Sequence, residues 1–531
     1  MNRVDACTLR PWIEDAHELA ILDAREEGEF GAGHLFWAVP CPLSRCEIRA
    51  RALLPRLTTR VVCVDDNRGV AGKLAAYLGS IGCTDLTVLE GGTPAWARAG
   101  YEVFTGANVL SRAFGGWVEL HYGTDSIEAP ALKAWLDTRR DVMVFDTRAH
   151  EEFVRMSIPG AVNVPGGELA YRIADLAPEA GTTLVVHSAG RTRGILGAES
   201  LRRIGLPNRV FTLHNGLMGW ELAGLRCERG RTGHSPLGVP KTLPIALERA
   251  ARFAEASGVG VIGPIDLTRF EEDPDRTCYV LDVREPAEFK TGHRPGSRNA
   301  PGGQLLSATD QWIGVRGARI VLLDDTGVRA RIAAAWLRQM GHRDVFVVEG
   351  GLDEVRTAGP GAIPVPELAN AVPMIGVPEL TALLDAGDRT IVVDVSRSID
   401  YRQGHIPGAL WGVRTRLATL APQLATAKHL VATSPDGSLA RLAVPELQAL
   451  TQAEVRALEG GNQVWHAFGR PLIKDKSTPP DEACIDVQLR PHDRDSGVEQ
   501  AMRAYLAWEM GLLDQIERDG TVQFGVATEL A

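Results

Sequence analysis

The chain has 531 residues, of which 45% are hydrophobic and 23% are charged, a composition typical of a globular protein with about three to five domains. Its formal net charge of -10 disfavours general nucleic-acid binding, because a protein that neutralises phosphates needs a basic face. No apolar run approaches the roughly 18 residues that cross a membrane, and Met1–Ala6 does not resemble a secretory signal. We therefore expect a cytoplasmic protein that binds neither nucleic acid nor membranes.

One pattern of residues occurs four times along the chain. In each copy an apolar run ends in an aspartate, and an acidic residue followed by an aromatic one comes a few positions later. These sets are Asp23 with Glu29-Phe30, Asp146 with Glu152-Phe153, Asp282 with Glu288-Phe289, and Asp394 with Asp400-Tyr401. A second apolar run then enters a loop, 42 residues after the aspartate in three copies and 40 in the fourth. The loops begin at Asp65, Ser188, Asp324 and Ser434.

A third apolar run closes each copy 25 or 26 residues beyond the loop. It ends in Glu90-Gly91-Gly92, His214-Asn215-Gly216, Glu349-Gly350-Gly351 and Glu459-Gly460-Gly461. Spacing kept this closely indicates four tandem copies of one unit of about 100 residues.

Strand-like and helix-like segments alternate within each copy. This predicts an α/β fold in which each unit is a small parallel sheet flanked by helices. Ligands of such sheets bind at the carboxyl ends of the strands, where the four loops fall. We place the units at residues 1–106, 125–232, 260–362 and 374–472, followed by a linker and an amphipathic helix in 473–531. Residues 104–124, 228–244 and 358–373 are expected to be connectors, with a helical stretch at 245–256.

The C-terminal segment predicts a helix from about Ser496 to Gly520. Its apolar residues recur at helical spacing: Met502, Tyr505, Leu506, Leu512, Leu513 and Ile516. We expect this stripe to dock on the repeats or on a second subunit, which leaves a homodimer open.

Cysteine and histidine spacing gives no sign of a metal site. The eight cysteines include no Cys-x-x-Cys pair. His34, His293 and His405 occupy equivalent positions in three different copies, so we expect them to be structural. The sequence predicts neither a metal nor a cofactor.

The loop of the second copy predicts an anion site. The apolar run Leu184–Val186 leads into Ser188–Arg193, and helix spacing resumes at Ile195. A strand, a tight loop and a helix N-terminus turn several backbone N–H groups toward one point, and such a nest attracts anions. Arg191 and Arg193 are expected to strengthen that attraction, and Gly190 lies at the centre of the loop.

The other three loops lack such a cradle. The first and third begin with two acids each, Asp65-Asp66 and Asp324-Asp325, which would repel an anion. The fourth has Pro435, which removes a backbone donor, and contains no arginine. Its Ser396 also replaces the arginine found two residues after the aspartate in the other copies. Only the second loop is expected to bind an anion.

These features together resemble the rhodanese family. They are the Asp-x-Arg of Asp146 and Arg148, the following Glu-Phe, the Gly-His-x-Pro-Gly pattern of other copies, the strand-loop-helix, and the late tryptophan at Trp220. The resemblance covers roughly residues 10–470 and implies four tandem rhodanese-like units. Active members of the family move a sulfane sulfur from thiosulfate or a persulfide to a thiol or cyanide, and a loop cysteine carries the sulfur. Ser188 stands at the position of that cysteine.

The resemblance implies roles for the residues of the second copy. Ser188 with Arg191 and Arg193 is the catalytic set, and Ala189, Gly190, Thr192 and Gly194 bind the substrate. Asp146, Arg148, His187 and Trp220 support the loop, and we expect Asp146 and Arg148 to brace it through an ion pair with Glu151 or Glu152. His187 is expected to face into the structure, because neighbours at a strand end point to opposite faces.

Two functional hypotheses follow. The first is a sulfurtransferase site in the second unit, with a small sulfur oxyanion or persulfide as donor and a thiol as acceptor. Since a hydroxyl cannot form a persulfide, the chain as written is then expected to be inactive toward thiosulfate. The second is a natural pseudoenzyme that binds an oxyanion or acts as a scaffold.

Overall fold

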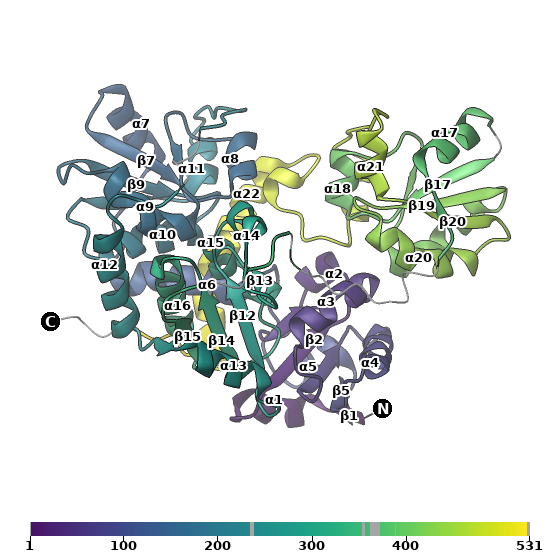
Figure 1. Cartoon of the computed structure of the whole chain (residues 1–531), viewed down its shortest axis with the longest axis horizontal. Helices are drawn as coiled ribbons and strands as arrows, with labels where there is room; N and C mark the ends of the chain where they lie inside the picture. Colours follow the sequence, from purple (N-terminus) through teal and green to yellow (C-terminus); the bar gives the residue numbers. More distant parts are fainter. Residues whose placement is uncertain are drawn as a thin grey trace.

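The computed structural model describes residues 2–233, 238–352, 356–359, 361, 372–387 and 389–527, which form four five-stranded parallel sheets. The sheets have the same strand order, β1-β5-β4-β2-β3 in the first and its equivalent in the others. Helices cover both faces of each sheet (Figure 1). The predicted α/β fold of four repeats is confirmed.

Repeats 1 and 2 share one order of elements, and repeat 2 contains most of the elements that build the candidate site. Repeat 1 comprises β1 (Asn2–Val4), α1 (Ala6–Glu14), β2 (Leu19–Asp23), α2 (Glu27–Gly31), β3 (Ala38–Pro40), η1 (Leu43–Arg45), α3 (Cys46–Leu53), β4 (Arg60–Val64), α4 (Val70–Ser80), β5 (Leu86–Leu89) and α5 (Gly92–Arg98). After α6 (Val109–Tyr122), repeat 2 comprises β6 (Ser126–Ile127), α7 (Ala129–Asp137), β7 (Val142–Asp146), α8 (His150–Arg155), β8 (Val162–Asn163), α9 (Gly166–Leu176), β9 (Thr183–His187), α10 (Thr192–Arg203), β10 (Val210–Leu213) and α11 (Gly216–Leu222).

Repeats 3 and 4 follow the same plan. After α12 (Leu243–Ala256), repeat 3 comprises β11 (Gly260–Ile262), α13 (Pro264–Glu272), β12 (Cys278–Asp282), α14 (Pro286–Thr291), β13 (Arg298–Asn299), α15 (Gly302–Ser307), η2 (Thr309–Gln311), β14 (Arg319–Leu323), α16 (Val328–Gln339) and β15 (Val345–Val348). Repeat 4 comprises β16 (Met374–Ile375), α17 (Val377–Asp385), β17 (Thr390–Asp394), α18 (Ser398–Gln403), β18 (Leu410–Trp411), η4 (Arg414–Leu420), α19 (Ala421–Leu424), β19 (His429–Thr433), α20 (Ser438–Gln448), β20 (Glu454–Leu458) and α21 (Gly461–Ala467). The tail contains η5 (Asp481–Ala483), η6 (Pro491–Asp493) and α22 (Val498–Asp519).

The central strand β9 carries the second loop out of the core. All five of its residues are buried, as expected for a central strand covered on both faces. It pairs with β7 in a register that places Asp146 opposite His187. The loop therefore begins at the carboxyl edge of the sheet, beside the end of β7.

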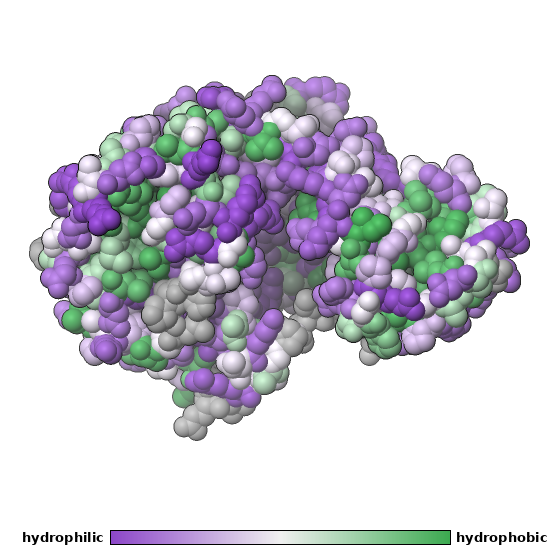
Figure 2. All heavy atoms as spheres, turned by 90° about the horizontal axis from the view of Figure 1, so that it is seen from above, coloured by the Kyte–Doolittle hydropathy of each residue, from purple (hydrophilic) through white to green (hydrophobic). Residues whose placement is uncertain are grey.

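Repeats 2 and 3 pack against each other through α9 and α15. The two Gly-Gly pairs that begin these helices meet backbone to backbone, and a Cβ on Gly167 would lie 3.2 Å from Gly302. Repeat 4 forms a separate lobe beside the other three repeats, as seen from above in Figure 2. It contacts repeat 1 through Arg414, which pairs with Glu47 at 3.0 Å.

Segments expected to be simple connectors contain regular structure. Residues 104–124 include the 14-residue helix α6, whose buried face packs against α10 and α22. The prediction missed it because Gly115 and Gly116 lower the helix propensity of the segment. Parts of the other two predicted connectors, residues 234–237 and residues 360 and 362–371, lie outside the described residues.

The helix predicted near the C-terminus is present as α22. The helix lies against the repeats of the same chain (Figure 1). Its apolar residues Met502, Leu506, Leu512 and Ile516 are buried there. The stripe is thus used within the chain. No helix in the described part of the chain is long and apolar enough to span a membrane.

His34 gives repeat 1 a specific acid sensitivity. Its ring is buried, stacks on Phe30 at 3.8 Å, and has a pKa lowered by burial to about 4. The unfolded chain binds this proton below about pH 6.5 and the folded chain only below about 4, so stability falls as the pH drops through that window. Between pH 7 and pH 5, we expect the free energy of unfolding of His34→Gln to fall by about 2 kcal/mol less than that of the parent. Urea denaturation at the two pH values measures this difference.

The exposed His466 on α21 provides the matched control. His466→Gln is expected to keep the pH dependence of the parent. Parallel stability curves for the parent and His34→Gln would show that His34 does not titrate as argued.

Candidate functional site in repeat 2

The second loop runs from the end of β9 to the start of α10. Ser188 is 2% exposed and lies at the base of this turn. Its Oγ accepts a hydrogen bond from the backbone N–H of Gly194 at 3.3 Å and donates one to the carbonyl of Gly190 at 3.2 Å. The side chain at position 188 therefore points into the turn, toward the first residues of α10.

The N-terminus of α11 holds the other side of the loop. The N–H groups of Leu217 and Met218 donate to the carbonyls of Ser188 at 2.8 Å and Ala189 at 2.9 Å. Gly216 has a φ of +56°, and a Cβ there would lie 2.3 Å from the Gly190 carbonyl. This close approach explains why every copy has glycine at this position, 27 or 28 residues after its loop begins.

Both loop arginines are already paired with carboxylates. Arg191 donates to Glu119 of α6, and Arg193 makes two hydrogen bonds to Glu152 of α8, at 2.8 and 3.0 Å. Burial opposes the charge of Glu152, yet the Arg193 guanidinium holds the pKa of that carboxyl well below its usual range. These two carboxylates were not anticipated from the sequence, and they offset part of the positive charge that Arg191 and Arg193 bring to the loop.

The supporting residues lie beneath the loop. Arg148 pairs with Asp146 at 2.6 Å and donates to the Met156 carbonyl at 2.5 Å. The predicted ion pair of this brace with Glu151 or Glu152 is wrong, because Glu152 is taken by Arg193. The ion pair is instead formed between Arg148 and Asp146.

His187 and Trp220 are both fully buried. Nε2 of His187 lies 3.7 Å from Asp146, and its Nδ1 lies 3.3 Å from the Ser188 carbonyl. Burial lowers the pKa of His187 despite the nearby Asp146 charge, so its ring is neutral at pH 7. Trp220 donates to the Arg226 carbonyl at 3.1 Å and packs in the core. Within the described residues, neither ring forms a hydrogen bond to the Ser188 hydroxyl.

The C-terminal helix covers the loop from outside. Thr192 Oγ1 donates to Glu509 of α22 at 2.6 Å, and a Cβ on Gly190 would lie 3.3 Å from Tyr505 and 3.5 Å from Glu509. Glu509 is buried, and its Oε2 has no hydrogen-bond partner among the described residues. An unpaired carboxylate oxygen thus lies close to the centre of the loop.

Sequence reasoning missed the residues that α6 and α22 bring to the loop. Glu119 and Glu509 lie 72 and 317 positions from their partners. The apolar stripe of α22 indicated that the helix would dock, but not which polar residue would face the loop.

The loops of repeats 1 and 3 hold a carboxylate where repeat 2 holds Ser188. Asp65 accepts hydrogen bonds from the N–H groups of Asn67 at 2.8 Å and Ala71 at 3.0 Å. Asp324 likewise accepts from the N–H groups of Gly327 at 2.6 Å and Arg329 at 3.1 Å. Because these carboxylates accept hydrogen bonds from the loop amides, the same amides are not free to bind an anion from solution. This occupation of the amides adds to the repulsion predicted from the sequence.

Repeat 4 keeps the geometry of repeat 2 without its arginines. Ser434 Oγ accepts from the Ala440 N–H at 3.3 Å, as Ser188 does from Gly194. Asp394 is bound by Ser396 and Asn462 in place of an arginine. Across the described ranges, no group of three or more His, Cys, Asp or Glu side chains is placed to hold a metal ion.

Comparison with known proteins agrees with this repeated geometry. The model of the Rhodanese-like domain matches residues 8–99, 128–223, 266–358 and 377–468, which is more than half of the chain. The chain belongs to the rhodanese family. The resemblance predicted from the sequence is thereby confirmed.

The rhodanese-like chain is similar along its whole length to one solved structure, described as a thiosulfate sulfurtransferase from Pseudomonas aeruginosa. The two are 40% identical with a TM-score of 0.92, and the match covers 99% of this chain and 100% of the other.

Two curated relatives match over a single stretch. One is an HTH-type transcriptional regulator of Mycobacterium tuberculosis, 34% identical over 20% of this chain and 49% of the relative. The other is a tRNA uridine(34) hydroxylase of Erwinia tasmaniensis, 29% identical over 21% of this chain and 33% of the relative. The chain thus spans half or less of the length of these relatives.

Proposed function

We propose that repeat 2 carries the sulfur-transfer site of this rhodanese-family chain and that position 188 is its nucleophile position. The proposal depends on the placement of the Ser188 side chain, which lies at the base of the loop and accepts a hydrogen bond from the amide of Gly194 at the start of α10. The full-length similarity to a protein described as a thiosulfate sulfurtransferase supports the same reaction class.

A thiolate at position 188 would be stabilised by the loop amides and the start of α10. It would attack the outer sulfur of thiosulfate or of a persulfide. With thiosulfate the sulfur–sulfur bond breaks, and sulfite leaves with the electron pair. A thiolate or cyanide acceptor then takes the outer sulfur from the resulting persulfide, and the thiolate at position 188 is regenerated.

Ser188 lacks what this reaction requires. A serine nucleophile needs an adjacent base, but the Ser188 hydroxyl donates to the Gly190 carbonyl and His187 faces Asp146. We infer that the chain with serine binds a small sulfur oxyanion without turning it over. The Asp146–Arg148 pair and Trp220 support the fold of the loop, and Ala189, Gly190, Thr192 and Gly194 shape the substrate site.

The pseudoenzyme alternative is favoured by a separate observation. Three carboxylates, from Glu119, Glu152 and Glu509, lie on or beside the loop, and two of them pair with its arginines. Because these carboxylates offset the charges of the two arginines, the loop would bind an anion weakly, or only when its ion pairs are broken. A cytoplasmic location and a homodimer remain part of the proposal.

Sulfite binding tests whether the loop is an anion site. Arg191→Ala removes a guanidinium whose Nε is buried without a hydrogen-bond partner among the described residues. It is expected to weaken binding by about 10- to 100-fold, the usual value of a charge-assisted hydrogen bond. Glu509→Gln is expected to tighten it by about 10-fold, because a like charge beside the anion is lost while an oxygen remains for Thr192. Isothermal titration calorimetry measures both effects.

Glu517→Gln, on the exposed side of α22, is the matched control and should bind sulfite like the parent. Unchanged affinity in Arg191→Ala would contradict the anion site. Unchanged affinity in Glu509→Gln would show that α22 does not face the bound anion.

A further inference from the structure

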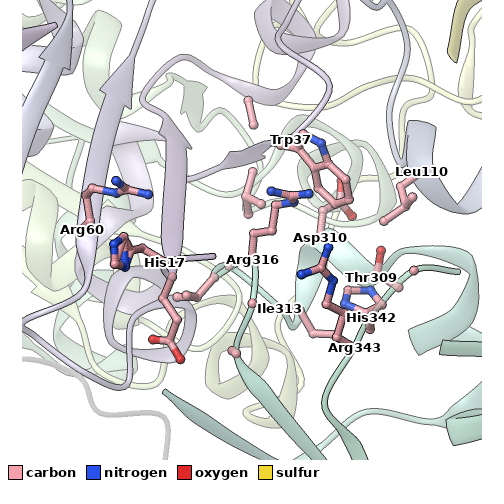
Figure 3. A pocket seen from close by; sticks show the side chains of 18 of the residues that line it. His17, Trp37, Arg60, Leu110, Thr309, Asp310, Ile313, Arg316, His342 and Arg343 are labelled. Carbon is pink, nitrogen blue, oxygen red and sulfur yellow. The ribbon is translucent and has the colours of Figure 1, made fainter. Parts of the chain in front are cut away.

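A cavity of about 640 Å³ lies between repeats 1 and 3, away from the loop of repeat 2. Repeat 1 contributes His17, Trp37 and Arg60 to its lining (Figure 3). Repeat 3 contributes the segments near Ile313 and Arg316, and the start of α6 forms one side of the cavity. The volume falls within the range of cavities that hold small organic ligands, roughly 300–1,000 Å³.

Most charges around this cavity are already paired. Asp15 binds Arg60 at 2.8 Å, and Glu18 binds both Arg56 at 3.0 Å and Arg276 at 3.1 Å. Asp344 also binds Arg276, at 2.6 Å. These pairs neutralise one another, and two further carboxylates, Asp85 and Asp275, also line the cavity.

Two arginines of repeat 3 are different. The side chains of Arg316 and Arg343 form no hydrogen bond or ion pair within the described residues, and both line the cavity (Figure 3). The Arg316 guanidinium lies 4.8 Å from the centre of the Trp37 ring, and its backbone is fixed by two hydrogen bonds to Leu19. Burial and the neighbouring Arg343 charge lower the pKa of Arg316, and the more weakly acting charges of Asp15 and Glu14 oppose this shift only in part.

His342 adds an unused polar group beside these arginines. Its Nε2 is buried without a hydrogen-bond partner in the described part of the chain. Burial, followed by the charge of Arg316, lowers the pKa of His342 to about 4, so the ring is neutral at pH 7. A neutral imidazole can donate one hydrogen bond to an acidic group from this nitrogen.

Asp310 is another carboxylate that lines the cavity. Burial raises the pKa of Asp310 to about 6, and its largest attractive partner is Arg49, which lies outside the cavity lining. Apolar surface from Leu110 and Ile313 lies close by (Figure 3). The cavity therefore combines two guanidinium groups that form no ion pair within the described residues, the exposed Arg343 and the partly buried Arg316, with an apolar wall.

We propose that this cavity is a binding site for a small organic anion. The acidic head group, a carboxylate or a phosphate, binds Arg316, Arg343 and Nε2 of His342, and a planar apolar body lies against Leu110 and Ile313. The ligand neutralises two adjacent guanidinium charges and satisfies the buried imidazole nitrogen. The site does not depend on the sulfur-transfer proposal, because no residue of the repeat 2 loop lines it.

Isothermal titration calorimetry with 1-naphthyl phosphate, 1-naphthoate and neutral 1-naphthol tests the proposal on the full chain. At least one of the two anions is expected to bind saturably with one site per chain, and at least 10-fold tighter than the neutral compound. The tighter anion identifies a phosphate or a carboxylate as the preferred head group. Arg316→Gln and Arg343→Gln are each expected to weaken anion binding by at least 10-fold.

Arg269→Gln serves as the control, since Arg269 is an exposed arginine of the same repeat outside the cavity. Hydrogen exchange on the unsubstituted chain provides a readout that does not depend on variant folding, with anion-induced protection expected in residues 313–318 and 341–344. No saturable binding of either anion, equal binding by the neutral compound, or protection elsewhere alone would overturn the proposal.

Discussion

Replacing Ser188 with cysteine is expected to raise thiosulfate:cyanide sulfurtransferase activity from background by about 10³-fold or more. Loss of a nucleophile from an otherwise intact site commonly costs several orders of magnitude, so restoring it should recover a large factor. The substitution exchanges one oxygen for one sulfur at a position held by the Gly194 amide. Cyanide-dependent formation of thiocyanate measures the rate.

Ser434→Cys is the matched control for this gain. Ser434 has the same contact to the start of its helix but a loop with no arginine and with Pro435. It is expected to stay at background. Equal inactivity of Ser188→Cys and the parent would contradict the assignment of repeat 2, whereas equal gains at both positions would show that the arginines are not required.

The second large effect is expected at Arg329, a fully buried residue between repeats 2 and 3. Its guanidinium binds Glu168 of repeat 2 at 2.6 Å and Glu288 and Asp325 of repeat 3 at 2.8 and 2.6 Å. Arg329→Met leaves these three carboxylates without this counter-charge. The Glu168 side chain is buried, and those of Glu288 and Asp325 are partly exposed. We expect the free energy of unfolding to fall by about 3–5 kcal/mol, measured by urea denaturation.

A second substitution separates lost charge from lost packing. Adding Glu168→Gln to Arg329→Met removes one buried charge and is expected to recover part of the loss. Arg269→Met, at an exposed pair with Asp266, should change stability by no more than about 0.5 kcal/mol. A loss below about 1 kcal/mol in Arg329→Met, or no recovery in the double variant, would refute this role.

The repeat architecture could be predicted because its signals are local and occur four times. The apolar run before Ser188 and the helix spacing after Arg193 place a loop between β9 and α10. Position 216 requires glycine because a Cβ there would overlap the backbone of that loop. The same glycine recurs in all four copies, so this requirement could be recognised from the sequence.

The electrostatics of the site could not be predicted in the same way. Glu119 reaches Arg191 from a segment in which Gly115 and Gly116 hide a helix, and Gly115 is required because a Cβ there would lie 2.8 Å from Thr192. Glu509 arrives from the far end of the chain. Such contacts depend on how helices of different segments pack, which the composition of each segment does not encode.

The acidic loops show a similar limit. Two aspartates at the start of a loop predict repulsion of an anion, and repeats 1 and 3 are indeed built around a carboxylate. The sequence could not indicate that the first aspartate would itself bind the loop amides. In these repeats the negative charge is part of the fold.

Intact-mass spectrometry after exposure to thiosulfate tests the assignment of position 188 most directly. The Ser188→Cys variant is expected to gain one sulfur atom, located by peptide mapping at residue 188 and removed by cyanide. The parent, which keeps eight other cysteines including the exposed Cys7, is expected to gain none. An unmodified residue 188 in the variant, or a sulfur atom gained equally by the parent, would contradict the proposed site.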